Sequence, residues 1–308
     1  MSSYRAARSL VVLGVAFASL SAIFIRISDA PPVVIAFYRM LFTSVMLVPL
    51  FLTRQKRGNP QEEGPEESPG AGPRGARLSQ RDLSLLVASG AFLAIHFASW
   101  NASLSYTTVA SSVVLVTLHP MFVALGSVLL LGEHVPRRAF GFIALAIAGS
   151  ALLSYGDFAL GPEALFGNML AVIGALAVAG YMLIGRFLRR SMQAKVYNIS
   201  VYSVAAIILL LISLLRGDAL GPYPAHEFLI FASLAFFCTI LGHSIFNWAL
   251  KYVSASSVST SILLEPIFAT LMALVLFHEV PGPLAIAGGS IVVLSLYMVL
   301  RTERLQGP

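Results

Sequence analysis

A single carboxylate, Glu265, lies within a long apolar run, at a depth where an unpaired charge is costly. An ionisable residue at the centre of a membrane span costs roughly 2.5–3.5 kcal/mol on insertion scales, so its presence needs a reason. Ser257 and Ser261 precede it at helical spacing and place three polar side chains on one helix face. This stripe predicts a carboxylate that binds a cationic group or accepts a proton inside a cavity. The alternative is a carboxyl group that is protonated or bonded to a neighbouring helix, because Pro266 breaks the local hydrogen-bond ladder.

His119 holds the corresponding place in the first half of the chain, with Ser112 two turns earlier. Imidazole titrates near neutral pH, so His119 is a candidate proton-sensitive partner of Glu265, or a polar wall of the same cavity. The alternative is a histidine that only packs.

Two further polar stripes lie on other apolar runs. His96 and Trp100 are four residues apart on one run, and Thr239, His243 and Asn247 follow one another at the same spacing on another. Tyr181 is a further candidate on a third run. Polar stripes on apolar helices face a bundle interior or a water-filled cavity. Interhelical hydrogen bonding without a ligand, worth about 0.6 kcal/mol per bond on average, is the alternative. Stripes at matching places in both halves favour one shared substrate cavity.

Charged residues near the predicted span ends are expected to be mainly structural. Arg39 is expected to make a structural pair as well; neutralising a carboxylate, coupling to charge or protons, and binding an anionic substrate group are the functional alternatives. Arg26 is expected to extend to the membrane interface, and Glu133 and Glu279 to bond the turns that follow them. Glycines such as Gly149 and Gly288 are expected to allow close helix packing.

Composition assigns the chain to a class before any motif does. It is 57% hydrophobic and 11% charged, against roughly 25% charged residues in soluble domains. Apolar runs of about 20 residues, each able to cross a hydrocarbon core of about 30 Å, recur along nearly the whole chain. We therefore predict an all-α polytopic membrane protein in contact with the lipid bilayer. The excess of 20 Lys and Arg over 14 Asp and Glu reflects the positive-inside bias, so no nucleic-acid partner is expected.

Polar breaks divide the apolar runs into ten predicted transmembrane helices. The predicted spans are 9–27, 33–53, 82–104, 108–131, 137–155, 166–186, 195–215, 226–248, 256–277 and 283–301. Residues 56–80 are rich in Pro, Gly and Glu and are expected to form a disordered cytoplasmic loop.

Basic residues predict the orientation. With the N-terminus inside, 17 of the 20 Lys and Arg lie in inside segments, while Arg26 and Arg216 are the two outside. A multi-pass protein of the inner or plasma membrane with both termini cytoplasmic is expected. The sequence gives no indication of oligomeric state.

An internal repeat relates the two halves, 1–155 and 156–308. The stretch from Ala110 to Glu133 returns as Ser256 to Glu279, with a proline in each. Each half holds five predicted spans, and because five is odd, the second half must lie inverted relative to the first. Matched apolar segments interrupted by proline in inverted repeats point to a transporter's binding site.

Motifs for nucleotide and metal chemistry are absent from the sequence. It contains no phosphate-binding Gly-x-x-x-x-Gly-Lys, no His-Glu-x-x-His pair and no Cys-x-x-Cys. No cofactor, no metal site and no catalytic residue is therefore expected, and the chain is not expected to be an enzyme.

The paired stretches Thr117-Leu-His-Pro120 with Glu133 and Leu263-Leu-Glu-Pro266 with Glu279, together with Tyr38-Arg39, resemble the EamA branch of the drug/metabolite transporter superfamily. This resemblance implies a ten-helix basket with a cavity between the halves, lined by the first, third, fourth, sixth, eighth and ninth spans. Members of the family carry amino acids, other small metabolites or toxic compounds, often outward.

The sequence thus predicts a secondary-type carrier that moves a small neutral or zwitterionic metabolite, amino-acid-like or another small organic solute, by export, through alternating access. One carboxylate and an aromatic ring suit an ammonium group and an apolar body. Hydrophobic cations are the alternative substrate, and coupling to protons through Glu265 or the histidines competes with facilitated diffusion. Functions of other classes are an integral-membrane enzyme acting on a lipid-like substrate and a membrane scaffold that works through the 56–80 loop.

Overall fold

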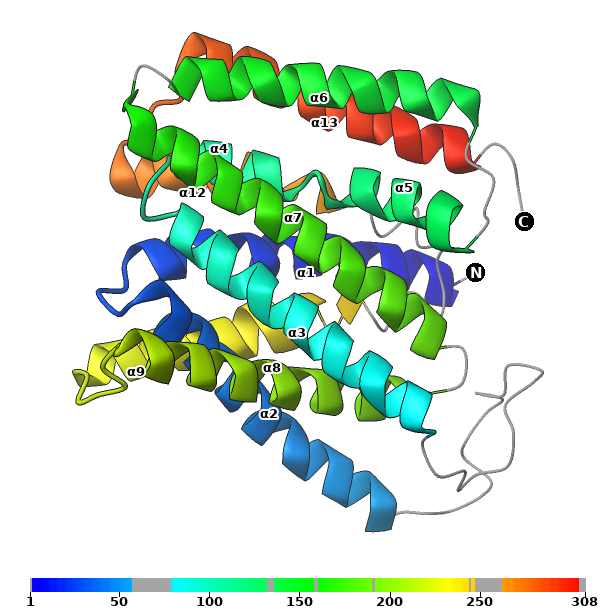
Figure 1. Cartoon of the computed structure of the whole chain (residues 1–308), viewed down its shortest axis with the longest axis vertical. Coiled ribbons are helices and arrows are strands. Elements are labelled where there is room, and N and C mark those ends of the chain that lie inside the picture. Colours follow the sequence, from blue (N-terminus) through cyan, green and yellow to red (C-terminus); the bar gives the residue numbers. More distant parts are fainter. Residues whose placement is uncertain are drawn as a thin grey trace.

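The computed structural model describes residues 2–56, 79–131, 136–157, 160–189, 192–243, 245–246 and 262–304. Every long element within these ranges is helical (Figure 1). The elements are α1 Ser2–Arg26, α2 Pro32–Lys56, α3 Gln80–Ser103, α4 Val109–Val116, α5 His119–Leu131, α6 Arg137–Asp157, α7 Pro162–Leu188, α8 Ala194–Arg216, α9 Ala225–Ser233, η2 Leu234–His243, α12 Glu265–Phe277 and α13 Pro283–Arg304. The predictions for Asn247, Ser257, Ser261, Glu133 and most of the 56–80 loop lie outside the described residues.

The apolar runs fold as membrane-crossing helices, as their length and composition predict. Seven described segments are long and apolar enough to cross a membrane, and three shorter apolar segments are Leu13–Arg26, Glu265–Phe277 and Pro283–Val299. An all-helical, multi-pass protein is therefore confirmed. The predicted count of ten crossings is not confirmed by these segments.

Local sequence signals set several helix ends. Ser79 and Asp82 form a capping box at the start of α3, and Thr108 caps α4 by accepting from the Ser111 N–H. The C-terminal end of α8 is capped by Gly217, whose φ of 73° lies in the left-handed region that glycine adopts without strain.

The predicted span 108–131 is divided into α4 and α5 by a turn at Thr117 and Leu118. Pro120 has no N–H to donate to the Val116 carbonyl, four residues earlier. The His119 ring replaces that donor, with Nδ1 at 3.2 Å from the Val116 oxygen. The proline break that marks this stretch in the sequence is thus a real break in the helix.

The predicted span 226–248 contains an irregularity that the sequence does not predict. After α9 the helix widens into a π-helix, η2. π-Helices are rare in proteins, and those that occur are often found at functional sites. The Thr239 hydroxyl donates to the Leu234 carbonyl, five residues earlier, at 3.2 Å.

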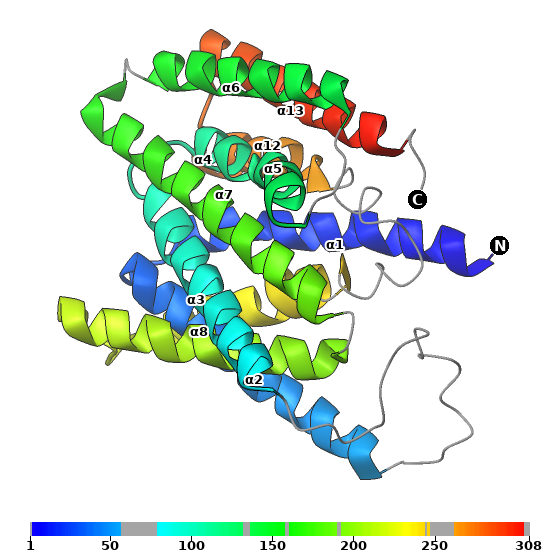
Figure 2. The same ribbon diagram turned by 45° about the vertical axis from the view of Figure 1, so that its right-hand side comes forward.

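Corresponding helices run in opposite directions in the two halves. In Figures 1 and 2, α1 runs from the end of the bundle where α13 finishes towards the opposite end, and its counterpart α7 runs back. We call these the termini end and the far end. Contacts also correspond: α7 packs on α3, α4 and α5, as α1 packs on η2 and α12. The contact of α8 with α3 matches that of α2 with α9 and η2. This is the pattern expected of two inverted repeats.

Glycines bring α6 and α13 together at the edge of the bundle (Figure 1). A Cβ atom on Gly288 would lie 2.6 Å from the Gly149 oxygen and 2.5 Å from the Leu153 nitrogen. These two glycines therefore serve close packing, as small residues do between membrane helices.

Candidate functional site

Arg39 is the most deeply buried charged side chain in the described part of the protein, with 0% of its surface exposed. Its Nε donates to Thr239 Oγ1 at 2.9 Å, and its Cζ lies 4.4 Å from the centre of the Phe97 ring. Nη1 and Nη2 have no hydrogen-bond partner among the described residues. The guanidinium is thus held at one nitrogen and against one ring, with its outer edge unbonded.

The π-helix supplies the hydroxyl that holds Arg39. Thr239 is 1% exposed; its hydroxyl donates to the Leu234 carbonyl and its oxygen accepts from Arg39 Nε. Because the π-helical ladder places Thr239 against Leu234, it fixes the direction of the hydroxyl. The irregular helix and the buried cation form one structural unit.

His96 and Trp100 form a stacked pair on α3, as their spacing predicts. Their ring centres are 5.9 Å apart with an interplanar angle of 14°. His96 Nδ1 lies 2.9 Å from the Gly174 oxygen, where the absence of a side chain lets α7 approach α3. Trp100 is 4% exposed, and its Nε1 has no hydrogen-bond partner in the described part of the chain. This indole is a second buried donor without an acceptor.

Glu265 is the first residue of α12, and its side chain is partly accessible. It interacts electrostatically with Arg39, but within the described residues the two groups form no ion pair. A carboxylate and a guanidinium therefore face the same interior without neutralising each other through direct contact.

The titratable groups of the sequence prediction come together in the bundle. His96 interacts electrostatically with Arg39 and His119, and His243 with Arg39, His96 and His119. These residues come from α2, α3, α5, η2 and α12, that is, from both halves. We call Arg39, His96, His119, His243 and Glu265 the interior cluster.

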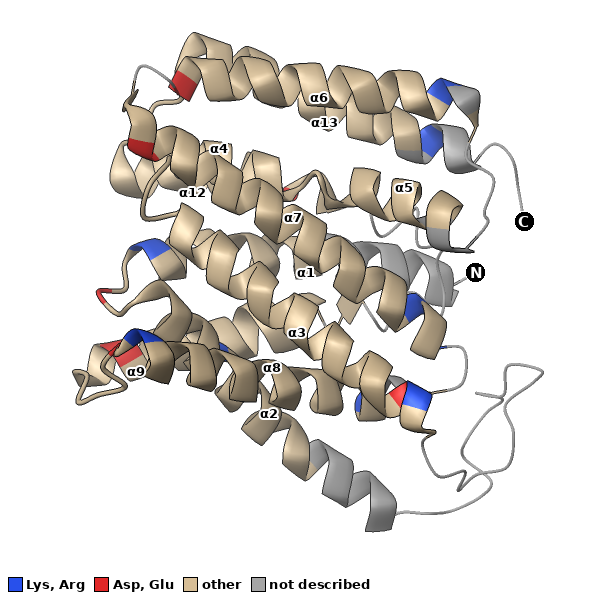
Figure 3. Cartoon of the chain, in the orientation of Figure 1, with Lys and Arg blue, Asp and Glu red and all other residues tan. Residues whose placement is uncertain are grey.

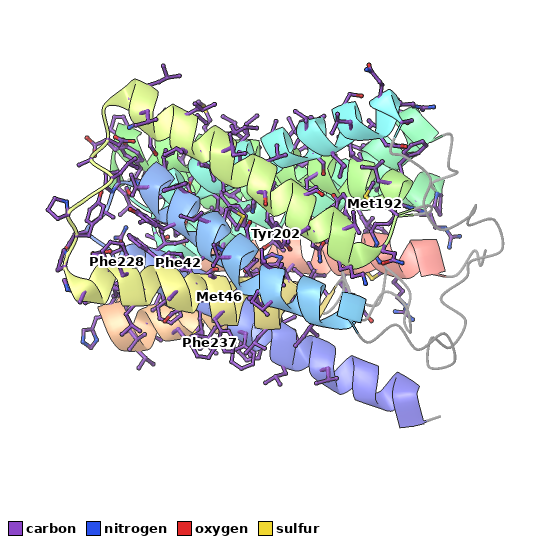
Figure 4. The ribbon with its side chains drawn as sticks, turned by 90° about the horizontal axis from the view of Figure 1, so that it is seen from below. Phe42, Met46, Met192, Tyr202, Phe228 and Phe237 are labelled. Carbon is purple, nitrogen blue, oxygen red and sulfur yellow. The ribbon has the colours of Figure 1, made fainter. Side chains whose placement is uncertain are left out.

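Other candidates have different surroundings. Ser112 is fully buried, and its hydroxyl bonds that of Ser103 at 2.5 Å, so it joins α4 to α3. Tyr181 stacks on Tyr197 with ring centres 6.1 Å apart and hydrogen-bonds Tyr202. Tyr202 also interacts electrostatically with Arg39, and it lies about midway along the bundle in Figure 4.

At the far end, polar groups join the two halves directly. Arg26 Nη2 lies 3.3 Å from Glu279 Oε1, and Arg26 Nη1 donates to the Leu104 carbonyl. Glu279 Oε2 accepts from the Val109 N–H at 3.0 Å. The prediction that Glu279 bonds its following turn is wrong, because both of its carboxylate oxygens find partners in the first half. Arg26 lies exposed at the end of α1, and it pairs with Glu279 there.

A second link between the halves is made by Glu227, which is 1% exposed. Its two carboxylate oxygens accept from the Ser28 hydroxyl at 2.5 Å and from the Asp29 N–H at 2.8 Å. Asp29, His226 and Glu227 bring potential metal-ligand atoms within 4.8 Å of one another. Since both oxygens of Glu227 are already bonded, we interpret the group as part of the contact between halves.

Sequence reasoning missed two contributors to the site. Phe97 and Tyr202 were not part of any polar stripe, because an aromatic residue on an apolar helix is usually interpreted as a core residue. Glu227 lies near a predicted span end, and only the fold reveals its partners in the α1–α2 loop.

Comparison with known proteins gives a consistent result. The family described as "EamA-like transporter family" matches residues 6–155 and 165–301. The chain is 25% identical over 237 residues to the "Pseudopaline exporter CntI" of Pseudomonas aeruginosa, covering 75% of this chain and 79% of that protein. It is 25% identical over 239 residues to the "Probable terminal-alkyne amino-acid exporter" of Streptantibioticus cattleyicolor, covering 75% and 78%.

Two further similarities cover more of the chain. An uncharacterized transporter of Archaeoglobus fulgidus is 26% identical over 284 residues, which are 90% of this chain and 91% of that one. A solved crystal structure superposes with a TM-score of 0.64 over 100% of both chains, at 16% identity. This last similarity concerns the fold alone.

Proposed function

The chain belongs to the EamA-like transporter family, and from this membership we propose that it exports a small amino-acid-like metabolite by alternating access. It is a membrane transporter of small metabolites and not an enzyme, since its family and its relatives are transporters. An enzyme acting on lipids and a membrane scaffold are therefore set aside.

One observation carries the proposal: the interior cluster brings ionisable groups from both halves within electrostatic range of one another, and one of them, His96, stacks on Trp100. Intramembrane ionisable residues that face a bundle interior mark solute and ion pathways. Glu265 offers a negative charge for an ammonium group, and the stacked rings of His96 and Trp100 offer an apolar surface. An amino-acid-like solute presents both features. The relative named as an amino-acid exporter supports this class.

The far-end contacts support alternating access. The Arg26–Glu279 ion pair and the Glu227 bonds to Ser28 and Asp29 join the halves at one end of the bundle. The proposed cycle breaks these links so that the interior cluster opens to the far end. In inverted-repeat carriers, two half-bundles rock around a fixed site in this way.

The proposed topology has ten crossings, with halves 1–155 and 156–308. The three shorter apolar helices would complete the crossings. Figure 3 supports cytoplasmic termini, because the basic residues gather at the termini end. They include Arg81, Arg138, Arg186, Lys195 and Arg301. We propose the inner or plasma membrane, where the positive-inside rule places this end in the cytoplasm.

Counterflow in liposomes tests the proposed function. Purified protein is reconstituted into liposomes that are loaded with unlabelled solute, and labelled solute is added outside. The three probes are leucine, 3-methylbutylamine and 4-methylpentanoate, which are a zwitterion, a cation and an anion with similar apolar bodies. Exchange of leucine is expected, and Glu265→Gln should lower it at least about 100-fold, since the ammonium loses its charged partner in a water-poor interior. The matched control, Glu163→Gln, changes an exposed carboxylate at the far end and should exchange normally. Exchange of none of the three probes by the folded wild type would contradict the proposal.

A further inference from the structure

The unbonded edge of Arg39 is the strongest unexplained feature of the protein. A guanidinium carries five N–H donors, and only the Nε donor has a partner in the described residues. Burying an ion without pairing is costly, and the cost is greater in a membrane. The side chain is 0% exposed, so solvent at the protein surface does not satisfy these donors.

The contacts of Arg39 fix which edge stays open. A guanidinium binds a carboxylate bidentately through one of its edges, in a planar fork. Thr239 occupies Nε, so the edge that includes Nε is engaged and the edge formed by Nη1 and Nη2 remains. Phe97 covers one face of the plane at 4.4 Å from Cζ. The side chain is therefore positioned in advance, which lowers the entropic cost of accepting a ligand.

Glu265 does not close this edge. The carboxylate lies within electrostatic range of Arg39 but makes no direct pair with it in the described part of the chain. Opposite charges kept apart in one interior suit a molecule that carries both charges itself. Resting on the proposed function, we propose that Nη1 and Nη2 of Arg39 bind the carboxylate of the solute while Glu265 binds its ammonium group. The substrate class is then zwitterionic α-amino acids and compounds with the same head group, not lipophilic cations.

The arrangement also assigns roles to the neighbouring groups. Thr239 is a positioning residue: it holds Nε and directs the free edge. Phe97 lies under the guanidinium, and the Trp100 ring, on the same helix, stacks on His96, so α3 supplies apolar ring surface for the body of the solute. Trp100 Nε1 is a further buried donor for an acceptor on the solute.

Competition with matched head groups tests the inference. Labelled leucine is exchanged in liposomes while leucine, leucinamide or 3-methylbutylamine competes; the amide has lost the negative charge and the amine has lost the carboxylate altogether. Wild-type protein is expected to prefer leucine over leucinamide at least about ten-fold, as one charge-assisted bidentate contact would give. In Arg39→Gln this preference should fall to less than about three-fold, because the fork is gone.

A second variant separates binding from folding. Arg39→Lys keeps the charge but removes the planar fork, so it should fold like the wild type and still lose most of the preference for leucine over leucinamide. Folding is checked by size-exclusion elution and melting temperature in detergent. Restoration of the full preference by lysine would overturn the bidentate contact.

The outcomes distinguish this inference from the proposed function. If the wild type exchanges 3-methylbutylamine but neither leucine nor an anion, the transporter stands and the Arg39 assignment is overturned. An unchanged preference in both Arg39 variants, with leucine exchange intact, overturns it as well. If the wild type exchanges none of the probes, the proposed function fails and the inference fails with it.

Discussion

Two regions of the bundle use their polar groups in opposite ways. At the far end, Arg26 contacts Glu279 and the Leu104 carbonyl, and Glu279 also accepts from the Val109 N–H. In the interior, Arg39 has one hydrogen bond and two unbonded nitrogens within the described residues. Both regions contain an arginine of the first half and a glutamate of the second. Only at the far end do the two side chains pair.

In the proposed mechanism, this difference separates the closed far end from the binding site. A paired cation and anion satisfy each other, so the far end holds the halves together in the described state. Unpaired charges that share an interior leave their bonding capacity for a ligand. In the proposed mechanism, the same two residue types therefore serve conformational change in one region and recognition in the other.

The largest effect is expected when the Arg26–Glu279 ion pair at the far end is broken. In Glu279→Ala the ion pair and the bond to Val109 are both lost, so the far end should open more often. Thr107 lines a shallow cavity together with Arg26 and is 4% exposed, so a cysteine can be introduced there as Thr107→Cys in a Cys238→Ala background. Its labelling by a membrane-impermeant maleimide should speed up about ten-fold, which corresponds to the loss of one charge-assisted contact.

The matched control for this prediction is Arg216→Gln. Arg216 is also a far-end arginine, but its partner Asp218, at 3.1 Å, lies in the same half. Its loss should leave labelling of the Thr107→Cys protein unchanged. Equal acceleration by both substitutions would mean that the far-end pair does not hold the halves together.

Removing the Thr239 hydroxyl, which accepts from Arg39 Nε, should have a smaller effect, which is measured as a change in head-group preference. Thr239→Val keeps the shape of the side chain but leaves Nε without its acceptor, so the fork becomes less well directed. The preference for leucine over leucinamide should fall about three- to five-fold, in line with one buried hydrogen bond. Thr43→Val is the control, because the Thr43 hydroxyl donates to the Arg39 carbonyl at 2.7 Å and does not touch the guanidinium. A similar loss of preference in both variants would mean that the change does not come from the bond between Thr239 and the guanidinium.

The smallest functional effect is expected at the edge of the bundle, away from both regions. Gly288→Ala would place a Cβ against the α6 backbone, 2.5 Å from the Leu153 nitrogen, and should cost about 1–3 kcal/mol of stability. A lower melting temperature with unchanged head-group preference is expected. Gly141→Ala, which has nothing within 4 Å of its added Cβ, should melt like the wild type. Altered preference in Gly288→Ala would connect this edge to the site.

The sequence predicts the helices and the stripe of His96 and Trp100 because both follow from local periodicity; the stripes that include Asn247, Ser257 and Ser261 lie outside the described residues. Apolar runs gave the helices, and the His96–Trp100 spacing gave the stacked pair. The proline at Pro120 gave the break between α4 and α5. These features depend on residues within one or two turns of each other.

Other features depend on contacts between distant segments and could not be predicted. The π-helix at Leu234–His243 has no composition that distinguishes it from an ordinary apolar helix. The partners of Arg26 and Arg39, Glu279 and Thr239, lie in the other half of the chain, so only the packed bundle selects them. For the same reason Ser112, at correct helical spacing from His119, turns out to bond Ser103.

The fluorescence of Trp100 tests the central claim most directly. The chain has two tryptophans, Trp100 and Trp248, so Trp248→Phe leaves the indole that stacks on His96 as the sole reporter. Titration of an exchange-competent Trp248→Phe protein with leucine should change the Trp100 emission saturably, and Glu265→Gln should abolish this change. Unchanged emission at leucine concentrations that saturate exchange would place the solute elsewhere and contradict the interior cluster as the binding site.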